Sequence, residues 1–316
     1  MNTPRLIQVA HADPAATRAE LIAGLTAPQA ALSPKYLYDA LGSRLFAAIT
    51  ELAEYYPTRT EAAIFRDQMQ AMAAELGPTE TLVDLGAGNC EKAARLFACF
   101  GVRRYVAVDI SADYLRESLD RLQYEHPSMS MLGVGLDFSQ ALHLPAEVGS
   151  GPLTLFYPGS SIGNFTPAEA LVFLRQVHAA CQGGSLLIGV DLVKTDAVLV
   201  PAYDDALGVT AAFNRNLLLH LNRLLDADFD IADWRHVGLF NHVESRIEMH
   251  LEAVRACAVR WPGGERSFQR GERIHSENSY KWRPDDFADL LRQAGFRRQR
   301  QWRDARDWFA VFAAHA

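Results

Sequence analysis

Helix-like and strand-like patterns of apolar residues alternate regularly between residues 60 and 195. In residues 60–77, for example, Ile64, Phe65 and Met72 recur at the spacing of one helix face. The pattern predicts further helices at 91–100, at 112–125 and from Thr166–Pro167, and strands at 81–86, 104–110, 129–138, 152–159 and 185–193. Because strands that alternate with helices form a parallel sheet covered on both faces, we expect an α/β fold.

The C-terminal residues continue this pattern with one more helix and two strands. The helix is expected within residues 284–296 and should stop at Gly295. The strands are expected at 297–304 and 307–315 and would close the sheet with an antiparallel edge. Arginines alternate with Gln and Trp in the first of them, which indicates a strand with one wet face.

Two segments do not fit the alternation and predict a second, smaller α+β domain. They are residues 1–59 and 196–279, the latter with a long helix around 208–225 and a strand-like stretch at 245–256. The larger domain would then consist of 60–195 plus 280–316. The smaller, discontinuous domain would consist of 1–59 plus 196–279.

Charge and hydropathy argue against nucleic acid or a membrane as a partner. The 316 residues carry a net charge of −7, whereas phosphate binding needs a basic surface. No apolar run approaches the ~18 residues of a membrane span, and the N-terminus has no apolar stretch of secretory length. We therefore expect a cytoplasmic protein that acts as a monomer on a small molecule.

Neither the cysteines nor the histidines have the spacing of common metal sites. The chain contains no C-x-x-C pair and no H-E-x-x-H. His220 and His250 are expected to be packed or surface residues rather than ligands. We therefore expect no bound metal ion.

The stretch LVDLGAGNCEK, residues 82–92, places two glycines directly after an expected buried strand. Such a turn lets a nucleotide approach the backbone at the carboxyl end of the strand. A dinucleotide turn requires a third glycine, but Glu91 stands in its place. Asp84, Gly86 and Gly88 instead form D-x-G-x-G, which is typical of S-adenosylmethionine (SAM) sites.

Acidic residues also end the next two expected strands. Asp109 can accept hydrogen bonds from both ribose hydroxyls of either kind of nucleotide. Asp137 and Phe138 suit an adenine, because a carboxylate accepts from the exocyclic amine while a ring packs on the base. Alternatively, the two are a turn acid and a core Phe. Taken together, the three strand ends favour a methyltransferase over a nicotinamide-dependent oxidoreductase.

Five longer stretches closely resemble the histidine Nα-methyltransferase family: residues 36–61 (YLYDALGSRLFAAITELAEYYPTRTE), 156–165 (FYPGSSIGNF), 188–194 (IGVDLVK), 246–251 (RIEMHL) and 275–282 (HSENSYKW). The resemblance extends from about Ser33 to the C-terminus. It implies a Rossmann-like class I SAM-dependent methyltransferase core and a smaller domain that holds the amino acid. Members of this family transfer three methyl groups from SAM to the α-amine of L-histidine. The products are hercynine and S-adenosylhomocysteine, and the reaction is the first step of ergothioneine biosynthesis.

The resemblance also implies a set of site residues. Cofactor binding falls to Tyr38, Gly86, Lys92, Asp109, Asp137 and Phe138. Substrate binding falls to Tyr55, Gly159, Asn164, Tyr203, Met249, Glu277 and Ser279. Tyr38 is in addition the candidate to position the amine or relay its proton, and Tyr56 is the alternative to Tyr55. Cys90 departs from the family pattern, where Ser or Thr is usual.

These residue types suit histidine as the substrate. A neutral imidazole has one donor and one acceptor, which Glu277 and Ser279 can match. Asn164 and Tyr203 offer donors to a free carboxylate. Without the resemblance, Glu277 and Ser279 would be interpreted as solvated loop residues, Asn164 as a turn residue and Tyr203 as an ordinary packing contact. The alternatives are an enzyme of the same fold for another free amino acid, such as tryptophan or a modified histidine, an oxidoreductase, or a non-catalytic binding protein.

Overall fold

The computed structural model describes residues 2–9, 13–139 and 141–316. Among these, the chain divides into two compact units. The first contains the described residues of Met1–Ala10 together with Pro57–Val193 and Tyr280–Ala316, and the second those of His11–Tyr56 together with Lys194–Ser279.

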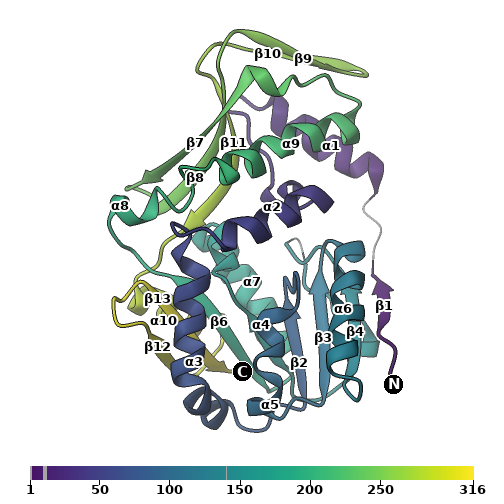
Figure 1. Cartoon of the computed structure of the whole chain (residues 1–316), viewed down its shortest axis with the longest axis vertical. Coiled ribbons are helices and arrows are strands. Elements are labelled where there is room, and N and C mark those ends of the chain that lie inside the picture. Colours follow the sequence, from purple (N-terminus) through teal and green to yellow (C-terminus); the bar gives the residue numbers. More distant parts are fainter. Residues whose placement is uncertain (1, 10–12, 140) are drawn as a thin grey trace. The chain divides into compact units, whose positions relative to one another are not determined.

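The first unit is built on a largely parallel sheet in the order β1-β4-β3-β2-β5-β6-β13-β12, with helices beside it (Figure 1). The chain passes outward from β2 to β4, returns to β5 and continues to β6, so the direction of winding switches between β2 and β5. β13 runs antiparallel to both of its neighbours, β6 and β12. The predicted α/β class and antiparallel edge are thus confirmed. The bounds are Arg5–Gln8 (β1), Thr81–Leu85 (β2), Arg104–Asp109 (β3), Ser130–Gly135 (β4), Thr154–Tyr157 (β5), Ser185–Asp191 (β6), Arg298–Arg303 (β12) and Phe309–His315 (β13).

β1 was not expected in this sheet, because residues 1–59 were assigned to the smaller domain. Arg5–Gln8 instead pairs in parallel with Leu132–Gly135 of β4. The assignment of these first residues was therefore wrong. The strand has only four residues, which is too few for the periodicity of its side chains to identify it.

The helices of the first unit are α3 (Tyr56–Leu76), α4 (Glu91–Ala94), α5 (Phe97–Phe100), α6 (Ala112–Glu125), α7 (Pro167–Ala180) and α10 (Pro284–Ala294), with 3-10 turns at Ala146–Val148 and Ser161–Asn164. The helix expected from Thr166–Pro167 is α7, and Thr166 caps it in a capping box with Glu169. The single helix expected at 91–100 was wrong. The N–H of Leu96 bonds to the carbonyl of Ala93 at 2.9 Å, and this tighter turn divides the segment into α4 and α5.

Both faces of the sheet are buried, because neighbouring residues of each strand point to opposite sides. On one side, Val83 and Leu155 belong to a core that includes Phe173 of α7 and Phe287 of α10. On the other side, Leu82, Tyr105 and Phe156 pack in a core with residues of α3 and α6. This burial explains the continuous apolar runs of the central strands.

The second unit combines helices with small antiparallel sheets. Its helices are α1 (Pro14–Thr26), α2 (Ala40–Thr50), α8 (Asp196–Leu199) and α9 (Val209–Leu225), with 3-10 turns at Pro34–Leu37 and Ile231–Asp233. β7 (Trp234–Asn241), β8 (Arg246–Ala253) and β11 (Arg273–Tyr280) form a sheet in the order β11-β8-β7, and β9 (Cys257–Trp261) pairs with β10 (Gly264–Phe268). The expected α9 and β8 are confirmed, whereas the sequence patterns did not reveal the other strands.

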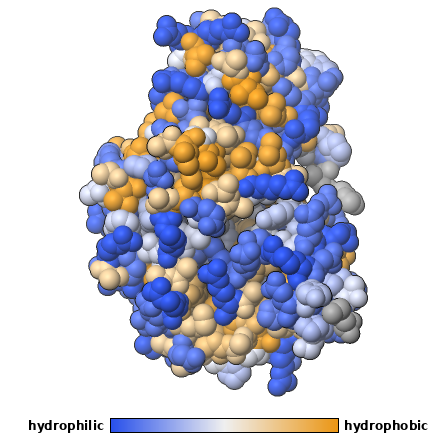
Figure 2. All heavy atoms as spheres, in the orientation of Figure 1, coloured by the Kyte–Doolittle hydropathy of each residue, from blue (hydrophilic) through white to orange (hydrophobic). Residues whose placement is uncertain are grey.

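The surface shown in Figure 2 carries hydrophilic and hydrophobic side chains side by side. In the part of the chain that the structure describes, no helix combines the length and apolar character needed to cross a membrane.

Candidate active site

Two glycines turn the chain sharply where β2 ends. Gly86 and Gly88 have φ angles of 72° and 53°, in the left-handed region that favours glycine. A Cβ atom at Gly88 would meet nothing within 4 Å, and one at Gly86 would meet only the Phe138 ring, at 3.8 Å. The backbone of this loop is therefore accessible to a ligand, and Phe138 lies next to it.

Asp109, at the end of β3, is bonded to the same loop. One carboxylate oxygen accepts from the N–H of Gly88 and the other from the N–H of Ser111, each at 2.9 Å. Burial raises the pKa of the Asp109 carboxyl, and these backbone donors oppose that shift. Each oxygen has a second lone pair, so the carboxylate can still accept from the hydroxyl groups of a ligand.

Asp137 and Phe138 directly follow β4, the neighbouring strand. Asp137 accepts from the N–H of Ser139 at 3.0 Å, and the Phe138 ring packs edge-on against Tyr157 with centroids 5.9 Å apart. Because β2, β3 and β4 are parallel neighbours, the three predicted strand ends meet at one edge of the sheet. Their roles toward a ligand stay predictions.

Lys92 and Gly159 are joined through Glu61 of α3. The Lys92 ammonium lies 2.7 Å from one carboxylate oxygen of Glu61, and the N–H of Gly159 donates to the other oxygen, also at 2.7 Å. The Glu61 side chain is only 1% exposed. Gly159 has a φ of 77°, and a Cβ atom there would lie 3.1 Å from the Lys92 nitrogen. One buried acid thus links a predicted cofactor residue to a predicted substrate residue.

A second buried acid, Asp84, lies in β2 just before the glycine loop. Its Oδ2 accepts from the Tyr105 hydroxyl at 2.8 Å, while Oδ1 has no hydrogen-bond partner among the described residues. Burial raises the pKa of Asp84 to about 7. Burial also raises the pKa of the neighbouring Cys90 thiol to about 12, so this residue is a neutral thiol near neutral pH.

Asn164 ends the 3-10 turn between β5 and α7. The segment before it is held by β6, because the hydroxyl of Ser160 accepts from the N–H of Asp191 at 2.8 Å. Asp191 in turn pairs with Lys281 at 2.8 Å, and both side chains are at most 1% exposed. The turn that carries Gly159 and Asn164 is therefore anchored from two sides, by Glu61 and by Asp191.

In the second unit, three of the predicted tyrosines belong to one aromatic cluster. The Tyr38 ring packs edge-on against Phe46 and Phe213, each at 5.5 Å between centroids. Phe46 also contacts Tyr55, at 6.2 Å, and Tyr55 contacts Tyr203, at 6.1 Å. These rings bring Tyr38, Tyr55 and Tyr203 together.

Tyr56, the alternative to Tyr55, has a different environment. Its hydroxyl accepts from the Lys194 ammonium at 2.9 Å. The Lys194 nitrogen also lies 4.5 Å from the centre of the Tyr56 ring. Contact with Tyr203 therefore favours Tyr55 as the substrate residue.

Tyr203 is fixed at both its backbone and its side chain. His236 donates from Nε2 to the Tyr203 carbonyl at 2.8 Å, while its Nδ1 accepts from the amide of Asn214 at 2.9 Å. Burial lowers the pKa of His236, which favours the neutral ring that this arrangement needs. The Tyr203 hydroxyl lies 2.7 Å from that of Ser279.

Glu277 and Ser279 lie on β11 and are 8% and 5% exposed. They are therefore not the solvated loop residues that they would have been taken for without the resemblance. β11 is the neighbour of β8, and the Ser276 hydroxyl donates to the carbonyl of Met249 at 3.0 Å. Met249 is buried and pairs with Gly238 of β7, whose backbone is close to the Tyr203 carbonyl. Met249 thus lies on the face of the sheet that meets Tyr203.

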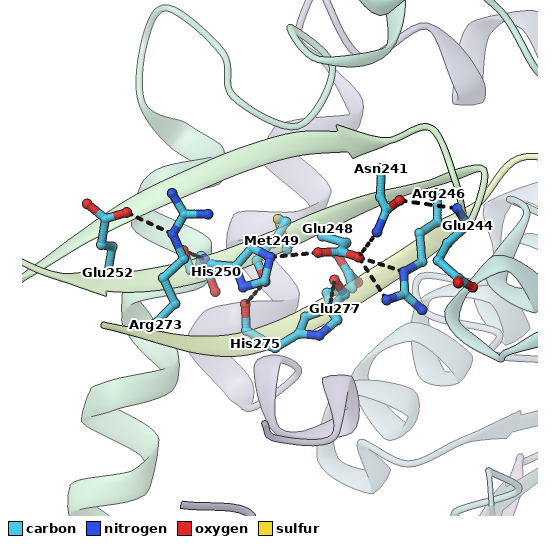
Figure 3. A network of polar contacts seen from close by, with 12 residues as sticks. Asn241, Glu244, Arg246, Glu248, Met249, His250, Glu252, Arg273, His275 and Glu277 are labelled. Atoms are coloured by element: carbon cyan, nitrogen blue, oxygen red, sulfur yellow. Dashed lines mark hydrogen bonds and ion pairs between the residues drawn. The ribbon is translucent and has the colours of Figure 1, made fainter. Parts of the chain in front are cut away.

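Figure 3 shows a polar network along β8 and β11 beside these residues. His250 Nε2 lies 2.9 Å from Glu248, and His275 Nε2 donates to the Glu277 carbonyl at 3.0 Å. Glu248, His250 and His275 offer ligand atoms within 4.8 Å of one another, as in a metal site. However, both Nε2 atoms are already hydrogen-bonded, and the Arg246 guanidinium lies 2.8 Å from Glu248, which disfavours a second cation. We interpret this network as support for the backbone of Glu277.

The structure thus divides the predicted site residues between the two units. Gly86, Lys92, Asp109, Asp137, Phe138, Gly159 and Asn164 belong to the first unit, and Tyr38, Tyr55, Tyr203, Met249, Glu277 and Ser279 to the second.

The sequence reasoning did not single out Glu61, Asp191 or Lys281. All three lie within the stretches that resemble the family, as charged residues among apolar ones. A charged residue within an apolar pattern is the feature that could have identified them, since such residues are rarely buried unless paired.

A family model described as histidine-specific, SAM-dependent methyltransferase matches residues 17–316. The chain belongs to this family. It is thus a SAM-dependent methyltransferase, as expected, and the alternative of a nicotinamide-dependent oxidoreductase is set aside.

Relatives of this chain match it over most of its length. Histidine N-alpha-methyltransferase of Mycolicibacterium smegmatis is 43% identical over 95% of this chain and 94% of its own length. The protein of the same name from Mycobacterium tuberculosis is 40% identical over 95% and 94%. N-methyltransferase fsqC of Aspergillus fumigatus is 30% identical over 87% of this chain and 77% of its own length.

The residues of the methyltransferase core fit SAM. The loop at Gly86 and Gly88 leaves space for a ligand, and the lone Oδ1 of Asp84 can accept a hydrogen bond from a bound group or water. Glu91 stands where a dinucleotide site would have its third glycine.

Proposed function

We propose that this methyltransferase adds three methyl groups to the α-amine of free L-histidine, which produces hercynine for ergothioneine biosynthesis. The observation that carries the proposal is the burial of Glu277 and Ser279 on one strand, with Ser279 bonded to Tyr203. The Glu277 carboxylate can accept from the imidazole N–H, and the Ser279 hydroxyl can serve the other ring nitrogen. The 43% identity to a histidine N-alpha-methyltransferase supports the same substrate.

The cofactor is assigned to the edge of the sheet in the first unit. Gly86 offers its exposed backbone, Asp109 accepts from the ribose hydroxyls, and Asp137 with Phe138 contacts the adenine. The remaining proposed cofactor residues are Lys92 of the first unit and, by resemblance, Tyr38 of the second. The bound SAM supplies an electrophilic methyl group on a sulfonium.

The substrate is assigned polar groups that match each of its parts. Asn164 and Tyr203 donate to the carboxylate, while Glu277 and Ser279 bind the imidazole with Met249 and Tyr55 beside it. Gly159 lets the backbone approach the amine, because it has no side chain. A residue within a peptide lacks both the free amine and the free carboxylate, so a free amino acid is the expected substrate.

The remaining task of the protein is to present a neutral amine. A free α-amine has a pKa of ~8, so much of it carries a proton at neutral pH and has no lone pair to attack. Tyr38 is the proposed group that positions this amine or relays its proton. The aromatic faces of the tyrosine cluster tolerate the permanent positive charge of the trimethylated product.

Mass spectrometry tests this proposal directly. In separate reactions, the purified protein is incubated with SAM and one candidate substrate. The candidates are histidine, tryptophan, methylated histidines and the other amino acids. Mono-, di- and trimethylhistidine should accumulate in sequence. Product from another amino acid but not from histidine would contradict the proposal. That outcome is the second candidate, since fsqC, named only as an N-methyltransferase, shares 30% identity.

A monomer in the cytoplasm is also part of the proposal. Its support is the net charge of −7, since a net charge far from zero disfavours self-association, and the absence of a membrane-spanning helix among the described residues. Light scattering of the purified protein tests the monomer, with the mass of one 35.0 kDa chain expected.

A further inference from the structure

Glu61 is a buried acid with three close neighbours from separate segments. One carboxylate oxygen accepts from the Lys92 ammonium and the other from the N–H of Gly159, both at 2.7 Å. The third neighbour is Gly189 of β6, where a Cβ atom would lie 2.1 Å from a Glu61 oxygen. Glycine at 189 therefore makes the room that the carboxylate occupies.

A stabilising role alone does not account for this arrangement. The adjacent core of α3 is apolar and includes Ile64, Phe65 and Met72. A buried ion pair contributes little net stability compared with apolar residues of similar size, because both charges lose their hydration. An acid at this position is thus better explained by what it holds in place.

We infer that Glu61 is a positioning residue that orients Lys92 and Gly159 and balances the Lys92 charge where the cationic cofactor binds. The inference rests on the proposed function only for the assignment of Lys92 to SAM. The sulfonium of SAM is positive, so an unpaired ammonium at Lys92 would repel it. The Glu61 carboxylate lies 2.7 Å from the Lys92 ammonium and balances its charge. Because Glu61 also accepts from the N–H of Gly159, it fixes the plane of the peptide bond that precedes this residue.

A comparison of SAM with S-adenosylhomocysteine isolates the charge effect. The two ligands share nearly all their polar groups, but the sulfur of the second is neutral. Glu61→Gln retains the size of the side chain and an acceptor for Gly159, yet removes the charge. We expect the affinity for SAM to fall about 3- to 10-fold more than that for S-adenosylhomocysteine, since Lys92 is partly exposed and solvent screens it.

Isothermal titration calorimetry of the full chain with each ligand measures the two affinities and thus the ratio of the affinity for SAM to that for S-adenosylhomocysteine. Glu75→Gln is the matched control, because Glu75 lies on the same helix and pairs with Arg298 at 2.6 Å, outside the proposed site. It should leave the ratio unchanged. Lys92→Gln provides a second variant: it leaves the Glu61 charge unpaired and should shift the ratio in favour of SAM.

If Glu61→Gln lowers the affinity for both ligands equally, Glu61 has a merely structural role and the inference is overturned. If that variant does not fold, an unchanged ratio in Lys92→Gln overturns it instead. Both experiments use ligand binding without histidine. A failure of the wild-type protein to methylate histidine would therefore contradict the proposed function and leave this inference standing.

Discussion

The hydroxyl groups of Tyr203 and Ser279 lie 2.7 Å apart, and this contact joins the segment before α9 to β11. Tyr203 is the proposed partner of the substrate carboxylate and Ser279 of its imidazole. The hydrogen bond between them therefore sets the spacing between the groups proposed to bind the two ends of histidine. An amino acid with a longer or shorter side chain would fit only one of the two.

Tyr203→Phe tests this spacing. The ring can keep its contact with Tyr55, but the substrate carboxylate would lose a proposed donor and Ser279 would lose its hydrogen bond to Tyr203. A hydrogen bond to a charged group is worth about 1.5–3 kcal/mol, so KM for histidine should rise about 10- to 100-fold. Steady-state kinetics at saturating SAM provide the measurement.

Ser279→Ala and the double variant complete a thermodynamic cycle with Tyr203→Phe. Because the two hydroxyls touch, their effects on kcat/KM should differ from additivity by about 0.5 kcal/mol or more. Strict additivity would mean that the hydroxyls act independently and that the contact does not set the spacing.

Glu277→Ala should damage histidine use and spare the cofactor. The imidazole N–H would lose its proposed acceptor, which costs about 1–3 kcal/mol, or about 5- to 100-fold in kcat/KM for histidine. The affinity for SAM, measured by calorimetry without histidine, should stay within about twofold of the wild type. Equal losses in both measurements would contradict the imidazole role.

Asp109→Ala should have the opposite effect. It removes the proposed acceptor of the ribose hydroxyls and also releases the N–H of Gly88 and Ser111. The affinity for SAM should fall at least about 10-fold. Asp113→Ala, an exposed acid in the first turn of α6, is the control and should bind SAM as the wild type does. Normal SAM binding by Asp109→Ala would refute the assignment.

The sheet unit was largely predictable, because its strands and helices are long enough to show their period. The glycine turn, Asp109 and Asp137–Phe138 follow from the rule that parallel strands place their carboxyl ends together. β11 was not predictable in this way, because it alternates polar residues on both faces (RIHSENSY) and resembles a loop. Glu61 was missed for a different reason: only the folded chain brings Lys92 and Gly159 to it, from 31 and 98 residues away.

Cys90 should tolerate replacement by serine. The thiol is buried at a φ of 63°, and burial raises its pKa to about 12, so it provides no thiolate to a ligand. Cys90→Ser should keep the affinity for SAM within about twofold. A loss of more than tenfold would show that the thiol itself supports the cofactor loop. Alkylation of the folded wild-type chain, followed by mass spectrometry, should leave Cys90 unmodified, because only thiolates react rapidly.

Protonation of the network beside Glu277 should destabilise the protein in mild acid. Burial lowers the pKa of both His250 and His275, although Glu248 opposes the shift. The unfolded rings take up protons below about pH 6.5, whereas the folded rings resist them. The unfolded state then binds more protons, so the free energy of unfolding should fall as the pH falls from about 6.5.

His275→Gln removes one of these groups. The slope of unfolding free energy against pH, below about 6.5, should decrease by up to 1.36 kcal/mol per pH unit, the value for one proton. Urea unfolding at several pH values between about 5 and 7.5 measures it. His143→Gln is the control, because that ring is exposed in the folded chain as it is in the unfolded one. If His275→Gln and the wild type show the same slope, the ring is not held neutral by its surroundings.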